Sequence, residues 1–226
     1  MKIAVIHATQ NSIQPLADAA ALINHEVKII NFLDETLLYR VNEKGRIDSV
    51  SLRNFLKIAM RAEESKPDGM IIACSIYCPY VSWVRQICDC PVIAIDQPMI
   101  TEAVALGSRI GVLATTAASG PSAVKKLEEE AEKQGKTIST ETKLLPKAMT
   151  ALVSGDVTGH DRLIKKGAEK LIEDGCDTIV LAQITMARAK YAMESLPVKV
   201  LSSPASGIRE LLKLLDDGRK EGSLKS

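Results

Sequence analysis

Aromatic residues are scarce in this sequence. Phe, Trp and Tyr together make up 3% of its 226 residues. Proteins that bind single-stranded nucleic acid stack bases on aromatic side chains, and this chain has little from which to build such a platform. The formal net charge of +1 also provides no overall attraction for a polyanion. We therefore expect no nucleic-acid partner.

Long apolar runs are missing as well. The apolar stretch in the opening residues MKIAVIH is too short for the core of a signal peptide and has no small-residue cleavage site after it. No run approaches the roughly 18 apolar residues of a membrane span. Hydrophobic residues make up 46% and charged residues 25%, which is an ordinary globular balance. We expect a cytoplasmic protein with no membrane partner.

Recognisable metal and cofactor motifs are also absent. The cysteines are odd in number, which argues against a disulfide framework. Their spacings do not match a zinc finger, and no histidine pair completes a site. Neither of the glycine patterns GxGxxG and GxxxxGK[ST] occurs. We therefore expect no metal and no cofactor, and we interpret Cys88, Cys90 and Cys176 as small apolar filler. The cysteines are Cys74, Cys78, Cys88, Cys90 and Cys176.

Short apolar runs alternate with segments of helical periodicity along the whole chain. In the helical segments, apolar residues recur at i, i+3, i+4, i+7 and i+8, as over residues 52–60. The apolar runs are continuous and rich in Val, Ile and Ala, which is typical of parallel strands buried on both faces. The predicted strands are residues 2–8, 27–32, 70–74, 91–95, 110–115, 138–144, 178–183 and 198–202.

The two halves of the chain resemble each other. Three segments of the first half recur in the same order in the second, at offsets of 107, 109 and 106 residues. Such regularity indicates an internal duplication. We predict an α/β fold with two similar Rossmann-like halves, each holding a four-stranded parallel sheet, related by a pseudo-two-fold axis with a cleft between them. The segment pairs begin at Lys2 and Arg109, at Asp68 and Asp177, and at Pro91 and Pro197.

The same alignment suggests where the lobes divide. Pro98 corresponds to Pro204, so the helix expected over residues 101–106 corresponds to the last helix of the chain. We predict that residues 1–97 and the C-terminal helix, residues 205–226, form the first lobe. Residues 98–204 form the second lobe.

Chemistry is expected at the ends of the predicted strands, because ligands of open parallel sheets bind beyond the carboxyl ends. The residues there are small, rich in hydroxyl groups and nearly uncharged, and the turns into the following helices present backbone N–H groups. This combination suits a small anion, in particular a carboxylate. The residues are His7, Thr9, Asn11, Ser12, Cys74, Ser75, Ile76, Tyr77, Asp96, Gln97, Thr115, Thr116, Ser119, Gln183, Ile184, Thr185, Ser202 and Ser203.

Cys74 is the reactive residue type in this set. A following helix N-terminus and neighbouring small polar groups would favour its thiolate. The alternative is a buried structural cysteine, because cysteine is among the residues most often buried. Position alone leaves both interpretations open.

Three stretches resemble the aspartate/glutamate racemase superfamily, which also contains hydantoin racemases, maleate isomerases and arylmalonate decarboxylases. They are Gly69-Met-Ile-Ile-Ala-Cys-Ser, Gly111-Val-Leu-Ala-Thr-Thr and Gly175-Cys-Asp-Thr-Ile-Val-Leu-Ala-Gln. Members place two cysteines on opposite sides of a substrate's α-carbon and move a proton without a cofactor. The resemblance implies that Cys74 is the first of these, and that Ser75, Ile76, Thr115 and Thr116 grip the substrate carboxylate. It also implies a homodimer or a higher homo-oligomer.

The sequence departs from the family at the second cysteine, where it has Gln183. A primary amide can hold a carboxylate by hydrogen bonds but is no acid or base at neutral pH. Two-base racemisation then needs another proton carrier. His160, just before the helix expected over residues 163–171, is the first candidate, and His7, Tyr77 and Thr185 are weaker ones.

We predict a cofactor-independent racemase or isomerase that acts at the carbon alpha to the carboxylate of a small acid, either an amino acid or a hydantoin-like compound, with Cys74 as base or nucleophile. The alternatives are a single-cysteine decarboxylase and a small-carboxylate-binding protein or inactive relative. Residues 39–48 and 145–159, expected as loops, would set the pocket size. The predicted substrate-binding residues are His7, Thr9, Asn11, Ser75, Ile76, Thr115, Thr116, Gln183 and Thr185.

Overall fold

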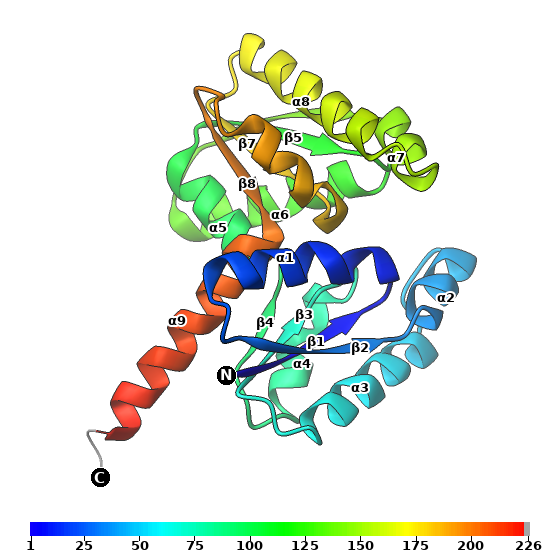
Figure 1. The fold of residues 1–226 in the computed structure, drawn as a ribbon, viewed down its shortest axis with the longest axis vertical. Coiled ribbons are helices and arrows are strands. Elements are labelled where there is room, and N and C mark those ends of the chain that lie inside the picture. The colour runs from blue at the N-terminus through cyan, green and yellow to red at the C-terminus, as the bar shows by residue number, and fades with distance from the viewer. Residues whose placement is uncertain (224–226) are drawn as a thin grey trace. The chain divides into compact units, whose positions relative to one another are not determined.

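The computed structural model describes residues 1–223 (Figure 1). The chain divides into two compact units, which are described separately below. Unit 1 contains Met1–Gln97 and the segment that begins at Pro204, and unit 2 is Pro98–Ser203. Among the described residues, no helix is long and apolar enough to cross a membrane.

Unit 1 contains a four-stranded parallel sheet in the order β2-β1-β3-β4. The inner strands β1 and β3 are almost wholly buried, whereas the edge strand β2 has alternating exposure. This difference reflects the sequence, since an inner strand of a parallel sheet is covered on both faces and needs apolar residues throughout. The strands are β1 (Lys2–His7), β2 (Lys28–Leu33), β3 (Gly69–Ile72) and β4 (Val92–Ala94).

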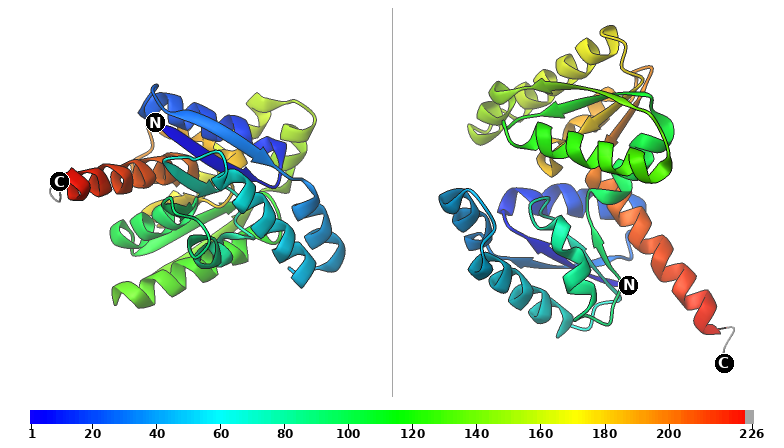
Figure 2. Two further views of the ribbon diagram at one scale, coloured as in Figure 1. Left: turned by 90° about the horizontal axis from the view of Figure 1, so that it is seen from below. Right: turned by 180° about the vertical axis from the view of Figure 1, so that it is seen from behind.

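Helices flank this sheet (Figures 1 and 2). The amphipathic helix α3 buries Phe55, Ala59 and Ala62 in the same core as residues of β1 and β3. The C-terminal helix α9 packs against β3, because a Cβ atom added at Gly69 would lie 2.9 Å from Leu211 Cδ1. The helices of unit 1 are α1 (Ile13–Ile23), α2 (Thr36–Lys44), α3 (Ser49–Glu63), α4 (Val81–Arg85) and α9 (Ser203–Ser223), with 3-10 turns at Gln10–Ser12 and Cys78–Tyr80.

Unit 2 repeats this plan with a parallel sheet in the order β6-β5-β7-β8. Its inner strands direct alternate residues to opposite faces: Ile179 and Leu181 pack with α8, and Val180 packs with α5 and α6. The elements are α5 (Gln97–Leu106), β5 (Arg109–Ala114), α6 (Ser119–Gln134), β6 (Ser139–Leu144), α7 (Pro146–Val153), α8 (Val157–Glu173), β7 (Thr178–Leu181), a 3-10 segment (Ile184–Met193) and β8 (Lys199–Ser202).

The predicted fold class is confirmed. All eight predicted strands are present, and the two sheets share one strand order. Gly135 ends α6 with a left-handed backbone, at a φ of 62°. The expected loops at residues 39–48 and 145–159 are wrong in part, because α2 extends into the first and α7 lies within the second.

Candidate active site

Cys74 lies just beyond the carboxyl end of β3, in a tight turn. Its backbone carbonyl accepts hydrogen bonds from the N–H groups of Tyr77, at 3.0 Å, and Cys78, at 3.2 Å. The residue is half-buried. The next two residues, Ser75 and Ile76, form the exposed tip of the turn. The sequence therefore locates this turn correctly at the end of the strand, with both predicted carboxylate-binding neighbours on its open side.

Tyr77, one of the weaker candidates for a proton carrier, packs in the core. Its side chain is fully buried and stacks on Phe55 with ring centroids 4.7 Å apart. The hydroxyl donates to the Leu37 carbonyl at 3.2 Å, and burial raises the pKa of Tyr77 to about 12. Tyr77 instead anchors the turn that carries Cys74 to the core and to α2.

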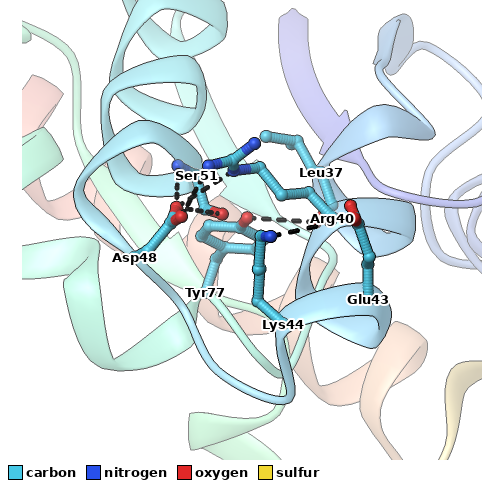
Figure 3. Close-up of polar contacts among 7 residues, drawn as sticks. All are labelled: Leu37, Arg40, Glu43, Lys44, Asp48, Ser51 and Tyr77. Atoms are coloured by element: carbon cyan, nitrogen blue, oxygen red, sulfur yellow. Dashed lines mark hydrogen bonds and ion pairs between the residues drawn. The ribbon is translucent and has the colours of Figure 1, made fainter.

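A polar cluster holds the connection between α2 and α3 beside Tyr77 (Figure 3). Arg40 donates two hydrogen bonds to the Asp48 carboxylate, at 2.6 and 3.1 Å. Asp48 also caps α3, because its Oδ1 accepts from the Ser51 N–H and hydroxyl, each at 2.8 Å. These donors hold the pKa of Asp48 well below its usual range. The cluster thus fixes the helices that contact Tyr77.

His7, which the sequence predicts to bind substrate, is fully buried. Its Nδ1 lies 2.6 Å from Ser12 Oγ and its Nε2 lies 3.0 Å from Asn31 Oδ1, so both ring nitrogens are occupied. Burial lowers the pKa of His7, which favours the neutral ring. Ser12 in turn donates to the Thr9 carbonyl at 2.7 Å, so His7 supports the loop that follows β1.

That loop keeps two other predicted binding residues near the surface. Thr9 is half-buried, and Asn11 is exposed at the start of the segment leading into α1. Both stay beyond the carboxyl end of β1, as the sequence predicts. Unit 1 therefore brings the β1 loop and the Cys74 turn to the same edge of its sheet, because parallel strands end together.

In unit 2, Gln183 follows β7 and its side-chain amide is anchored by unit 2 residues. Its Oε1 accepts from the Thr115 N–H at 2.6 Å and from the Thr115 hydroxyl at 2.9 Å. The Ser119 hydroxyl lies 3.0 Å from the same oxygen and shares its proton with the Thr116 carbonyl, also at 3.0 Å. A backbone N–H can only donate, so this contact determines which end of the amide faces Thr115. The NH₂ end of Gln183, with its two N–H donors, therefore faces away from Thr115.

Thr116 lies beside this anchor and is exposed. Its hydroxyl donates to Ser119 Oγ at 3.0 Å. Thr115, by contrast, is 3% exposed, and both its N–H and its hydroxyl donate to Gln183 Oε1. Of the two threonines predicted to grip a carboxylate, Thr116 is at the surface, and Thr115 supports the amide.

His160 does not precede its helix but lies in the first turn of α8. The helix begins earlier than expected because Asp156 caps it, accepting from the Gly159 N–H at 2.8 Å. His160 is fully buried. Its Nδ1 lies 2.8 Å from Asp161 Oδ1, and Arg188 Nε contacts the same carboxylate at 3.1 Å.

Two buried polar atoms near this helix have no hydrogen-bond partner among the described residues. They are His160 Nε2 and Thr185 Oγ1. Thr185 belongs to the 3-10 segment that packs against α8. Unpartnered buried polar atoms are rare in folded proteins and call for an explanation. A histidine oriented through one nitrogen by a carboxylate, with the other nitrogen available, has the geometry of an acid or base.

Cys88, Cys90 and Cys176 are poor nucleophiles. Burial raises the pKa of Cys88 to about 11 and also raises the pKa values of Cys90 and Cys176. Glu63 adds to the shift at Cys90, whose Sγ lies 3.1 Å from a Glu63 oxygen. Across residues 1–223, no group of three or more His, Cys, Asp or Glu side chains is placed to hold a metal ion.

Comparisons with known proteins agree with the architecture. The sequence matches the family described as Asp/Glu/Hydantoin racemase over residues 11–211. Allantoin racemase from Klebsiella pneumoniae is similar with a TM-score of 0.72 and 19% identity, over 96% of this chain and 89% of that one. An aspartate racemase homologue from Pyrococcus horikoshii gives a TM-score of 0.69 and 16% identity, over 95% and 99%.

A further solved structure is also similar. Glutamate racemase from Francisella tularensis subsp. tularensis, in complex with D-glutamate, gives a TM-score of 0.65 and 17% identity, over 96% of this chain and 82% of that one. At such identities the likeness shows the fold. No curated protein matches the sequence significantly.

Proposed function

The chain belongs to the Asp/Glu/hydantoin racemase family, and we propose that it is a cofactor-independent isomerase acting at the carbon alpha to a carboxylate or ring carbonyl. The substrate is a small amino acid or a hydantoin-like compound. Cys74 acts as the base that removes the α-proton. The observation that carries this proposal is the pair of equivalent strand ends, which holds a half-buried thiol at Cys74 and an anchored amide at Gln183.

The two positions have different tasks in this scheme. The Cys74 thiolate takes the α-proton and becomes a thiol, and the C–H electron pair moves into an enolate. Negative charge then develops on the substrate oxygen, where fixed N–H donors are most effective. The NH₂ group of Gln183 supplies such donors, since its oxygen is held by Thr115 and Ser119. Gln183 thus replaces proton transfer by charge stabilisation.

Racemisation also needs a proton for the opposite face, and we assign this step to His160. The doubly protonated ring donates its Nε2 proton to the enolate carbon and becomes neutral. Asp161 contacts Nδ1 and so orients the ring. Arg188 Nε donates to the same Asp161 oxygen at 3.1 Å. The unpartnered Nε2 atom is the feature that supports this role.

Two measurements distinguish the role of Cys74 from that of His160. NMR in D₂O measures exchange of the substrate α-proton, and chiral chromatography measures racemisation. The test compounds are α-amino acids and 5-substituted hydantoins. His160→Asn should still exchange the α-proton through Cys74 but lose racemisation by roughly 10²–10⁴-fold, the usual contribution of a general acid. His25→Gln changes an exposed histidine and is the matched control. Undiminished racemisation in His160→Asn would remove His160 from the mechanism.

A second variant examines the position of the missing cysteine. Gln183→Cys in the His160→Asn background should restore part of the lost racemisation if position 183 faces the same substrate as Cys74, because a thiol can carry the proton that an amide cannot. No restoration in a folded double variant would show that position 183 does not serve this reaction. No exchange with any compound, together with ordinary stabilisation by carboxylates, would identify a binding protein.

A decarboxylase is the second candidate, because Cys74 is the one thiol among the predicted strand-end residues. Loss of CO₂ from a 2-substituted malonate leaves the C–C electron pair in an enolate, which needs a single proton from the Cys74 thiol. Release of CO₂ from such malonates without exchange of amino-acid α-protons would favour this reaction.

A further inference from the structure

A pocket of about 490 Å³ opens beside Thr115 at the carboxyl end of β5. One side of it is a single face of α7, where lining residues recur at i, i+3, i+4 and i+7. This helix lies in a segment that the sequence suggested would be a loop. The lining residues are Thr115, Pro146, Met149, Thr150, Val153 and Ser154.

The lining face of α7 is not the face that packs in the core of unit 2. Ala148, on another face of α7, is fully buried in that core. Val153 is 76% exposed, and Met149 is half-buried. Apolar side chains at this face therefore remain available to a ligand.

One lining residue connects the pocket to the proposed active site. Thr115 lines the pocket, and its N–H and hydroxyl both hold the Gln183 oxygen. Because Thr115 contacts both Gln183 and the pocket, a substrate held beside Gln183 has its substituent near α7 in this proposal. This step of the argument rests on the proposed function.

The lining contains hydroxyl and apolar side chains but no charged side chain. A carboxylate placed there would lose hydration without gaining a cationic partner, which is costly. Lys147 is on α7 but is not among the lining residues. An alkyl group would instead cover Met149 and Val153 and be removed from water.

We propose that this pocket receives an alkyl substituent of the substrate, so that the protein selects substrates with apolar side chains over those with a second carboxylate. The chemistry of the lining distinguishes leucine-like or 5-isobutylhydantoin-like compounds from aspartate-like or hydantoin-5-acetate-like ones. Val153 and Met149 are then specificity-determining residues.

The experiment compares kcat/KM for α-proton exchange with 5-isobutylhydantoin and hydantoin-5-acetate. We expect a preference of roughly tenfold or more for the alkyl compound, the usual scale of discrimination in an apolar pocket. Val153→Lys should lower this ratio by tenfold or more, mainly by improving the reaction of the acetate. Leu106→Lys, which changes an exposed apolar residue of α5 outside the pocket, should leave the ratio unchanged.

Binding measured by calorimetry keeps this test independent of turnover. Wild-type protein should bind 4-methylpentanoate more tightly than glutarate, and Val153→Lys should reverse or abolish that order. If the protein exchanges the α-proton of neither hydantoin but still binds 4-methylpentanoate more tightly than glutarate, the proposed function is refuted and the pocket proposal is supported. Equal binding of the two acids, or a ratio unaffected by Val153→Lys, would overturn the pocket proposal.

Discussion

Replacing Gln183 by Glu and by Leu separates the anchoring of this side chain from its role as a donor. Glutamate keeps a carbonyl-like oxygen for the donors of Thr115 and Ser119, so the fold should be as stable as the wild type. Leucine removes the acceptor and leaves the buried Thr115 N–H without a partner. An unsatisfied buried donor costs about 1–3 kcal/mol, and unfolding in urea should show a loss of this size for Gln183→Leu alone.

The change that preserves stability, Gln183→Glu, should nevertheless lower catalytic activity. Gln183→Glu exchanges two N–H donors for a negative charge beside the substrate oxygen. A hydrogen bond to a charged group contributes about 1.5–3 kcal/mol, so kcat/KM for α-proton exchange should fall roughly 10–150-fold. Wild-type kcat/KM in Gln183→Glu would refute the donor role. Unchanged stability in Gln183→Leu would refute the anchoring.

Three further outcomes are expected. Tyr77→Phe removes the hydrogen bond to the Leu37 carbonyl and should lower the free energy of unfolding by about 1 kcal/mol; no loss in urea would contradict this anchor. The pKa of His7 lies below its ordinary 6.5, so the unfolded chain binds more protons and stability should fall as the pH drops below about 6.5; this dependence should weaken in His7→Gln but not in His25→Gln. Brief iodoacetamide treatment at pH 8 should leave Cys88 unmodified, because its pKa is raised to about 11; rapid alkylation seen by mass spectrometry would contradict this.

The strands were predictable because burial on both faces demands continuous apolar sequence. Strands β1 and β3 of unit 1 have such apolar sequences and are buried along almost their whole length, and β7 of unit 2 has the same pattern. Chain order then placed Cys74 and Gln183 at the carboxyl ends of equivalent strands. The positions of the proposed catalytic and donor residues thus follow from the duplication.

Side-chain direction within the turns was not predictable. Tyr77 follows Cys74 by three residues, yet the turn directs it into the core against Phe55. His7 ends β1 and is held by Ser12 and Asn31, which are separated from it by 5 and 24 residues. Neither contact leaves a periodic signal in the sequence.

The sequence of the second half contains two helix-start residues, one for α7 and one for α8. Pro146 at the first position of α7 is a helix-start signal, and α7 supplies one wall of the pocket. Asp156 caps α8 and places His160 inside the helix. Its Ser-Gly-Asp context favours a turn, which concealed the cap.

The most direct test of the account is α-proton exchange in D₂O by wild-type protein and by Cys74→Ser, with leucine and 5-isobutylhydantoin as substrates. The account predicts exchange above the uncatalysed rate in the wild type and its loss in Cys74→Ser, with both proteins equally stable in urea. Exchange that survives Cys74→Ser would contradict the assignment of Cys74 as the base.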